Sequence, residues 1–194
     1  MSSVQGPVGI LALQGDFALH AQLLSDSDVE TVEVRGAEDL TGVSGLLLPG
    51  GESTTIAMGI DRENLKDPIR NLAKAGLPVF GTCAGMVLMS SAHLGLIDME
   101  VERNAFGRQI HSFEADLKID GLDGPPVRGL FIRAPVVTFV GDAVRVFAEI
   151  DGSTVGVKQD NCTAISFHPE LVGDARLHLL ALGLKQWPEL PASS

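Results

Sequence analysis

Cysteine and positive charge are both scarce in this chain. Only Cys83 and Cys162 occur among its 194 residues, far apart in sequence, so the chain lacks the dense disulfide framework of small secreted domains. Lysine and arginine total 14 against 25 acidic residues, which gives a net charge of −11 and a pI near 4.7. No basic stripe is present to displace counterions from phosphates, so nucleic-acid binding is not expected. We expect a soluble cytoplasmic protein.

Long apolar segments, internal repeats, metal-ligand clusters and a P-loop are also missing from the sequence. The apolar run over 8–13 is too short for a signal peptide or a membrane span and has no basic leader, so we interpret it as the first strand. With 194 residues and 45% hydrophobic content, one sizeable core is expected. We predict a single domain over residues 1–187, a flexible C-terminal tail over residues 188–194, and no metal or cofactor.

The first half of the sequence alternates between strand and helix patterns. Short apolar runs predict strands, and apolar residues at helical spacing predict the helices between them. The predicted elements are a strand over 8–13, a helix marked by Phe17, Ala21 and Leu24, strands over 29–34 and 45–48, a helix marked by Leu65, Ile69, Leu72 and Ala73, and a strand entering a turn at 79–80. This order indicates repeated βαβ units and a mainly parallel sheet.

The pattern changes in the second half. Between residues 113 and 165, turns containing glycine separate apolar runs such as 136–140 and 145–150, which predict further strands, several of them antiparallel. Cys162 lies in one alternating run and is interpreted as a small strand residue without a chemical role. A closing helix is marked by Leu177, Leu180, Ala181 and Leu184. The predicted fold class is α/β, with a mainly parallel central sheet and additional antiparallel strands.

The pentapeptide over 81–85, GTCAG in one-letter code, has the form G-x-nucleophile-x-G and lies between a strand pattern and a helical one. An α/β enzyme places its nucleophile on such a turn, and the flanking positions need glycine because side chains would clash where the backbone turns sharply. We expect Cys83 to be exposed at a helix N-terminus, which favours the thiolate, the attacking form of sulfur. Taken alone, the motif fits a buried structural cysteine as well as a catalytic one.

A second set of reactive groups follows the apolar run over 163–165. Residues two apart in an extended strand point to the same face, so His168 and Glu170 are predicted to project together. Thiol catalysis needs an imidazole to move the proton of Cys83 and a carboxylate to fix the imidazole tautomer. A surface histidine and glutamate beside a turn are the alternative. The preceding core strand favours catalysis, because reacting groups collect at the carboxyl edge of open α/β sheets.

The segment over 46–53, LLLPGGES, is another strand pattern that ends in a glycine turn. Paired glycines let backbone N–H groups approach a substrate closely, so we expect Gly51 to supply one oxyanion donor and Ala84 the other. A plain turn would explain the segment by itself. Together with Cys83 and His168, the turn completes a catalytic set.

The order PGG, GTCAG and HPE along the chain resembles the class I, or triad, glutamine amidotransferases. Five blocks resemble more narrowly the branch that forms the glutaminase subunits of pyridoxal 5'-phosphate synthases. These blocks are residues 13–16 (LQGD), 49–55 (PGGESTT), 103–109 (RNAFGRQ), 131–135 (FIRAP) and 167–171 (FHPEL). They extend from the first strand to the last, so the resemblance covers nearly the whole chain. It implies a flavodoxin-like, three-layer glutamine amidotransferase domain.

The resemblance implies a reaction and a set of roles. Cys83 would attack the side-chain amide of L-glutamine, His168 would move the proton, and Glu170 would orient His168. The residues implied to form the glutamine pocket are Gly51, Glu52, Ser53, Arg103, Ile132 and Arg133. For the two arginines, exposed salt bridges are the usual alternative role.

The resemblance also implies a partner. Glutaminase subunits of this branch supply ammonia to a synthase subunit, a (β/α)8 barrel that makes pyridoxal 5'-phosphate from ribose 5-phosphate and glyceraldehyde 3-phosphate. Ammonia is wasted without an acceptor, so an oxyanion hole that forms only on docking would be useful. We therefore expect the glycine turn over 49–51 to be flexible and to move when the partner binds.

Two alternatives stay open from the sequence. The chain could be the glutaminase subunit of another biosynthetic pathway, or an inactive regulatory domain on the same fold, since fold does not determine function. Val87, where many other triad amidotransferases have glutamine, and the RNAFGRQ block favour the vitamin B6 branch. The intact set of Cys83, His168 and Glu170 favours an active enzyme.

Overall fold

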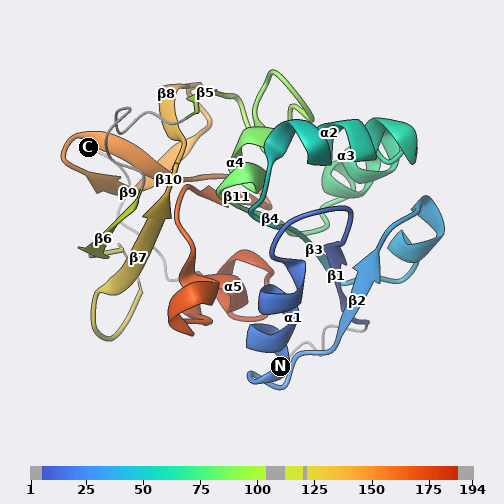
Figure 1. Ribbon diagram of the computed structural model, residues 1–194, viewed down its shortest axis with the longest axis horizontal. Coiled ribbons are helices and arrows are strands. Elements are labelled where there is room, and N and C mark those ends of the chain that lie inside the picture. The colour runs from blue at the N-terminus through green and yellow to red at the C-terminus, as the bar shows by residue number, and fades with distance from the viewer. Residues whose placement is uncertain (1–5, 104–111, 120–121, 188–194) are drawn as a thin grey trace.

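The computed structural model describes residues 6–103, 112–119 and 122–187, and within them the parallel part of a nine-stranded sheet lies between two layers of helices (Figure 1). The strands are β1 (Val8–Leu11), β2 (Thr31–Val34), β3 (Gly45–Leu48), β4 (Val79–Thr82), β5 (Met99–Glu102), β6 (Ser112–Leu117), β7 (Val127–Ile132), β8 (Val136–Val140), β9 (Arg145–Ile150), β10 (Ser153–Gln159) and β11 (Cys162–Ile165). The helices are α1 (Phe17–Ser25), α2 (Ser53–Arg62), α3 (Lys66–Lys74), α4 (Ala84–Met89) and α5 (Arg176–Ala181), with 3-10 helices η1 (Ala37–Leu40) and η2 (Pro169–Val172).

The central sheet has the strand order β2-β1-β3-β4-β11-β10-β8-β5, and β9 pairs with β10 outside this path. The first five strands of this order are parallel, in the 2-1-3-4-5 arrangement of flavodoxin-like folds. The strands that follow β11 join antiparallel, and β6 and β7 form a separate antiparallel pair. The predicted fold class is confirmed.

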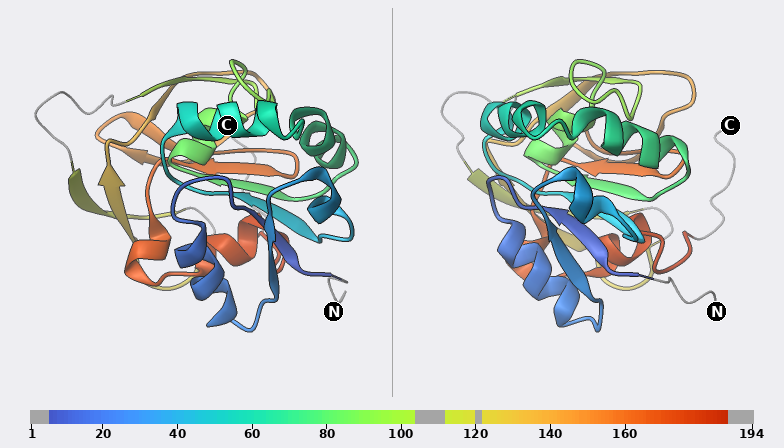
Figure 2. Two further views of the ribbon diagram at one scale, coloured as in Figure 1. Left: turned by 45° about the vertical axis from the view of Figure 1, so that its right-hand side comes forward. Right: turned by 90° about the vertical axis from the view of Figure 1, so that its right-hand side faces the viewer.

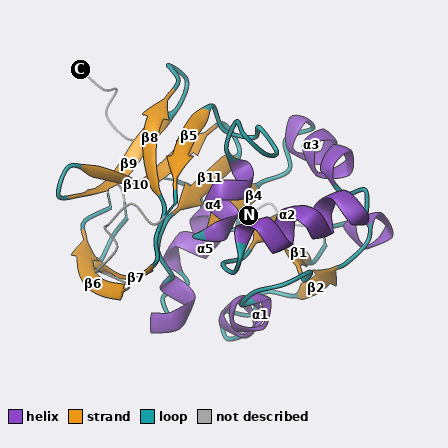
Figure 3. Ribbon diagram, turned by 45° about the horizontal axis from the view of Figure 1, so that its top comes forward, coloured by secondary structure: helices purple, strands orange, loops and turns teal. Residues whose placement is uncertain are grey.

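Helices cover both faces of the parallel strands. α2, α3 and α4 lie on one face and α1 and α5 on the other, which three further views show (Figures 2 and 3). Two apolar clusters correspond to these two faces, one around Ile56 and Ile69 and the other around Leu24 and Phe167. β3, β4 and β11 are buried along their whole length because both of their faces are covered. The carboxyl ends of these three parallel strands therefore lie side by side at one edge of the sheet, held in place by the packing on both faces.

Some element boundaries differ from the sequence predictions. β1 ends at Leu11 and β2 begins at Thr31, so both strands are shorter than expected. α2 was not predicted at all, because only a turn was assigned to its first residues. The closing helix α5 ends at Ala181, before the expected Leu184, since Gly183 adopts a left-handed φ of 71° that stops a helix.

Parts of two predictions concern residues outside the described ranges. The tail over 188–194 is one, and residues 104–109 of the RNAFGRQ block are the other. Trp187, the last described residue, packs against Phe147 with ring centroids 5.3 Å apart. Among the described residues, no helix has both the length and the apolar character needed to cross a membrane.

Candidate active site

The turn that carries Cys83 connects β4 to α4 at the centre of the parallel strands. Cys83 is the N-cap residue of α4 and has φ 49° and ψ −103°, a conformation that non-glycine residues rarely adopt. Its N–H donates to the carbonyl of Ile165 at 2.8 Å, which ties the turn to β11. A Cβ on Gly85 would lie 2.1 Å from the carbonyl oxygen of Leu48, and one on Gly81 would lie 2.7 Å from the Gly85 backbone. The structure thus confirms that both flanking positions need glycine.

The exposure predicted for Cys83 is wrong. Its relative exposure is only 8%, because the end of β7 comes close to it and the Ile132 carbonyl oxygen lies 3.9 Å from Sγ. Cys83 nevertheless lines a cavity of about 620 Å³ at the carboxyl edge of the sheet. A partly enclosed thiol of this kind is reached only by a ligand that enters the cavity.

His168 and Glu170 contact each other as predicted, but not through strand alternation. β11 ends at Ile165, and His168 is the N-cap residue of η2, whose first residue is Pro169. The 3-10 turn brings Glu170 Oε1 to 2.5 Å from His168 Nδ1, and the His168 N–H donates to the Leu130 carbonyl at 3.0 Å. The prediction was right about the pair and wrong about the backbone that forms it.

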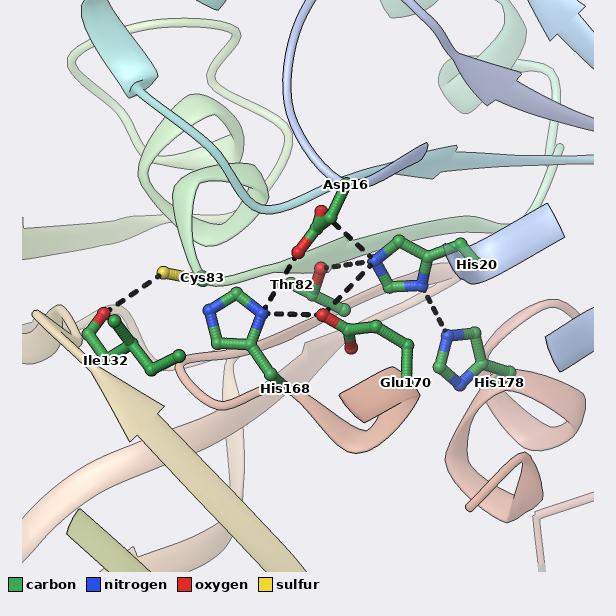
Figure 4. Close-up of polar contacts among 8 residues, drawn as sticks. All are labelled: Asp16, His20, Thr82, Cys83, Ile132, His168, Glu170 and His178. Carbon is green, nitrogen blue, oxygen red and sulfur yellow. Dashed lines mark hydrogen bonds and ion pairs between the residues drawn. The ribbon is translucent and has the colours of Figure 1, made fainter. Parts of the chain in front are cut away.

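A second carboxylate, which the sequence did not predict, reaches the same ring nitrogen. Asp16 Oδ2 lies 3.2 Å from His168 Nδ1, so Asp16 and Glu170 face one imidazole edge while Cys83 lies on the opposite side (Figure 4). Asp16 immediately precedes α1 and lines the cavity, whereas the Glu170 side chain has no exposed surface. His168 is therefore held from behind by two acidic groups.

These contacts shift the ionisation of the cluster. Burial acts to lower the pKa of His168, but hydrogen bonds to the two carboxylates and to the Cys83 thiol outweigh it and raise that pKa to about 12. Burial acts to raise the pKa of Asp16, but its contacts with His168 and His20 prevail and lower it to about 2. His168 therefore holds its proton at neutral pH, as a group that protonates a leaving amine must.

The glycine turn over 50–51 packs directly against the His168 imidazole. A Cβ on Gly50 would lie 2.5 Å from His168 Cε1, so only glycine permits this approach. The Gly50 carbonyl accepts from the Asp16 N–H at 3.2 Å, and the Glu52 N–H donates to Gln14 Oε1 at 2.9 Å. The LQGD block thus anchors the turn that carries Gly51.

The cavity brings together all six residues that the resemblance implied for glutamine. Its lining residues are Gln14, Asp16, Gly51, Glu52, Ser53, Cys83, Ala84, Val87, Arg103, Ser112, Ile132, Arg133, Pro135, His168 and Leu171. Glu170 lies behind His168 and is not among them. The sequence had not assigned Gln14, Asp16, Val87, Ser112, Pro135 or Leu171 to the site.

Glu52 and the two arginines have different local roles. The Glu52 carboxylate caps α2 by accepting from Thr54 and Thr55, contacts that lower its pKa to about 2. Arg103 Nη1 lies 3.2 Å from Thr54 Oγ1. Neither Arg103 nor Arg133 forms an ion pair with any described residue, so the salt-bridge alternative has no support in this part of the chain. Both arginines line the cavity and bring positive charge to it.

Three further buried residues extend the cluster behind Glu170. His20 from α1, Thr82 from β4 and His178 from α5 are each fully buried and connected by hydrogen bonds (Figure 4). The spacing of Asp16 and His20, four residues apart at the start of a helix, is a signal that the sequence offers. His178 has no local signal, since only the packing of α5 against the sheet brings it here.

The cluster contains two groups of three residues whose potential metal-ligand atoms lie within 4.8 Å of one another. The groups are His20, Glu170 and His178, and Asp16, His168 and Glu170. In both groups, however, donor atoms contact each other directly, at 2.8 Å between the two buried imidazoles and 2.5 Å between His168 and Glu170. Lone pairs that are engaged in such contacts are not directed at a common ion, so the arrangement fits a hydrogen-bonded network better than a metal centre.

Comparisons with known proteins agree with this geometry. Residues 10–182 match the SNO glutamine amidotransferase family. The pyridoxal 5'-phosphate synthase subunit PdxT of Frankia alni is 51% identical over 187 residues, which cover 91% of this chain and 94% of that protein. The PdxT subunit of Streptomyces coelicolor is 50% identical over 182 residues, which cover 89% and 90% respectively.

Solved structures give the same result for the fold. A crystal structure of a glutamine amidotransferase has a TM-score of 0.87 and 44% identity, and the match covers 92% of this chain and 98% of that one. PurLQS from Thermotoga maritima has a TM-score of 0.71 at 18% identity, covering 86% and 88%, which is a likeness of fold alone.

Proposed function

We propose that this chain, which belongs to the SNO glutamine amidotransferase family, hydrolyses L-glutamine to L-glutamate and ammonia and supplies the ammonia to a pyridoxal 5'-phosphate synthase. The observation that supports this most strongly is the arrangement of His168 between Cys83 and two carboxylates, at a cavity lined by the predicted glutamine contacts. High identity to PdxT subunits over most of the chain favours this branch over the glutaminase of another pathway.

In the proposed reaction, Cys83 Sγ attacks the side-chain carbonyl carbon of glutamine, and the carbonyl oxygen becomes an oxyanion. The N–H groups of Gly51 and Ala84 stabilise that charge. The carbon–nitrogen bond then breaks, and the proton held by His168 passes to the leaving nitrogen, which departs as ammonia. Water attacks the resulting thioester with His168 as the base, and glutamate leaves while the sulfur is regenerated.

The charged residues around the cavity support the proposed glutamine pocket. Arg103 and Arg133 line the cavity, and we propose that they bind the α-carboxylate of the substrate, which needs a cation or an array of donors. Ser53 supplies a hydroxyl beside them, and the Glu52 carboxylate, ionised because of its capping contacts, is suited to the α-ammonium group. Hydrolysis thus requires a substrate with both groups of an amino acid.

The partner is proposed to be a (β/α)8-barrel synthase subunit that combines ammonia with ribose 5-phosphate and glyceraldehyde 3-phosphate. We expect this heteromeric complex in the cytoplasm, since a free thiol nucleophile persists in a reducing compartment and the chain has only two cysteines. The chain itself needs no cofactor in this scheme.

The test combines this chain with the synthase subunit of a close relative and measures glutamate release and pyridoxal 5'-phosphate formation. We expect product from glutamine only when both subunits are present, and product from ammonium chloride with the synthase subunit alone. Cys83→Ala should abolish the glutamine route and leave the ammonium route intact. Absence of glutamate release by the wild-type mixture, with the ammonium route working, would refute the proposed function.

A further inference from the structure

Two buried imidazoles lie behind the residues of the proposed reaction. His20 Nδ1 is 2.8 Å from His178 Nε2, and neither side chain has any exposed surface. The other nitrogen of His20, Nε2, is 3.1 Å from Thr82 Oγ1 and 3.7 Å from both Asp16 Oδ1 and Glu170 Oε1 (Figure 4). His20 thus lies 3.7 Å from both carboxylates that contact His168, and His178 contacts His20 on the other side of its ring.

The 2.8 Å contact requires one proton between two ring nitrogens, which allows two arrangements. In the first, His178 Nε2–H donates to His20 Nδ1, and the proton of a neutral His20 is on Nε2. In the second, His20 Nδ1–H donates to His178 Nε2, so His178 must carry its own proton on Nδ1. A doubly protonated His20 would impose the second arrangement on His178.

The surroundings favour the first arrangement. In the second, a neutral His20 would direct the lone pair of Nε2 at two carboxylates, and the Nδ1–H of His178 would be buried where no described residue accepts it. In the first, the positive N–H edge of His20 faces those carboxylates and donates to Thr82 Oγ1. Of the four ring nitrogens of His20 and His178, only His178 Nδ1 then lacks a hydrogen-bond partner among the described residues.

Burial supports neutral rings at both positions. It lowers the pKa of His20, against the opposing effect of Glu170 and Asp16, and burial together with His20 lowers the pKa of His178 well below its ordinary value. The titratable groups that face His20 are Asp16 before α1, His168 and Glu170 at η2, and His178 on α5. These two histidines therefore act through their tautomers, meaning which ring nitrogen carries the proton, and not through a positive charge.

We propose that His20 is a positioning residue for glutamine hydrolysis, held by His178 in the tautomer whose Nε2–H faces Asp16 and Glu170. Two carboxylates that share one imidazole edge repel each other, and without a positive edge behind them one would turn away from His168. The His20 N–H keeps both of them directed at His168 Nδ1. This inference rests on the proposed function, because it concerns how His168 is held during that reaction.

Kinetics of the complex with the synthase subunit test this role. His20→Leu removes the N–H and should lower kcat about tenfold, the lower end of effects seen when a supporting hydrogen bond is lost. KM for glutamine should not change, because His20 does not line the cavity. The basic limb of the pH profile should move to lower pH, because His168 loses part of the carboxylate support that favours its protonated form.

Matched variants separate positioning from mere packing. His20→Gln places an amide N–H near the position of Nε2 and should restore much of the rate and of the pH profile. His178→Gln keeps a donor near Nε2 and should resemble the wild type, whereas His178→Leu should shift the profile in the same direction as His20→Leu. Equal profiles for His20→Leu and the wild type, or equal losses in the Leu and Gln variants, would overturn the proposal.

Nuclear magnetic resonance tests the tautomer independently of activity. In the ¹⁵N-labelled full chain, two-bond proton–nitrogen correlations of the ring should show protonated Nε2 and unprotonated Nδ1 for both His20 and His178. A proton on His20 Nδ1 would contradict the proposal whether or not the enzyme is active. If the wild-type complex releases no glutamate, the proposed function fails, but the spectrum still shows which nitrogen carries the proton in each of the two histidines.

Discussion

The two ends of the β4–β11 strand pair invite comparison, because each carries a cysteine and a cavity. Cys83 follows the carboxyl end of β4 beside a cavity of about 620 Å³, and Cys162 begins β11 beside a cavity of about 550 Å³. Their relative exposures are similar, 8% and 4%. Neither burial nor cavity size distinguishes the two thiols.

The two thiols differ in the neighbouring groups that can accept or donate a proton. Cys83 faces His168 and its two carboxylates, whereas burial raises the pKa of Cys162 to about 11. Near Cys162, the amide of Asn161 donates to the carbonyls of Ala73 and Leu77, and Arg70 donates to backbone carbonyls. These donors are engaged with backbone carbonyls. Lys158 and Asp160 interact with the Cys162 thiol, but no histidine among the described residues lines this cavity, so the amino end lacks the imidazole–carboxylate pair found beside Cys83.

The largest expected effect comes from removing each thiol in turn. Cys83→Ala should reduce glutamine hydrolysis in the complex by about 10⁴-fold or more, because no other group can form the acyl-enzyme. Cys162→Ala should retain nearly all of it. Glutamate release measured with the synthase subunit present checks both, and substantial hydrolysis by the Cys83 variant would remove the distinction between the two ends.

The imidazole and its carboxylate should act as a unit. We expect His168→Ala to lower the rate by about 10²–10⁴-fold, since proton transfer is lost, and Glu170→Gln to lower it less, because an amide can still position the ring. The losses should not multiply in the double variant. Rates of the two single variants and the double variant, measured in parallel, test this. A double variant slower by the full product would show that the two residues work independently.

Docking of the partner is expected to act at the carboxyl end only. Rotation of the Gly50–Gly51 peptide would redirect one N–H of the proposed oxyanion hole and would break the hydrogen bond from Asp16 to the Gly50 carbonyl. The loss of one such donor typically costs about 10²–10³ in turnover. Glutamate release by the isolated chain should therefore be slower by about that factor than release with saturating synthase subunit. Equal rates would exclude the gate and leave the roles of Cys83 and His168 untouched.

The smallest expected effect concerns stability in acid. The pKa of Asp16 in the folded chain, about 2, is below its ordinary value of 3.8, so its carboxylate stabilises the fold above pH 4, and this contribution is lost as pH falls from 3.8 through about 2. Asp16→Asn should cost about 1 to 2 kcal/mol of unfolding free energy at pH 7, allowing for partial exposure. Urea denaturation at several pH values should show this difference narrowing toward pH 2.5. A difference that widens in acid would contradict it.

The parallel sheet and the nucleophile turn were predictable because their signals are local. The buried strands are short apolar runs. Gly81 is required by a contact with the backbone of Gly85, and Gly85 by a contact with the end of the neighbouring strand β3. α2 was missed because Thr54, Thr55 and Gly59 are poor helix formers. Its start depends on the cap that Glu52 provides and its stability on the burial of Ile56 and Ile60.

The carboxylates and imidazoles behind the site were less predictable, since they come from elements far apart in the chain. Asp16, His20 and His178 meet only because α1 and α5 pack on the same face of the sheet. The contact between His168 and Glu170 was predicted from strand alternation, and a 3-10 turn supplies it instead. The partial burial of Cys83 depends on β7, which follows it by more than forty residues.

The most direct test of the difference between the two thiols is the site at which a glutamine analogue becomes covalently attached. The full chain, with the synthase subunit, is incubated with an L-glutamine analogue that has an electrophilic carbon in place of the amide, and the modified peptide is identified by mass spectrometry. We predict one adduct, on Cys83, which excess L-glutamine prevents and His168→Ala slows. An adduct on Cys162, or labelling of Cys83 that glutamine does not slow, would contradict the assignment of the active site to the carboxyl end.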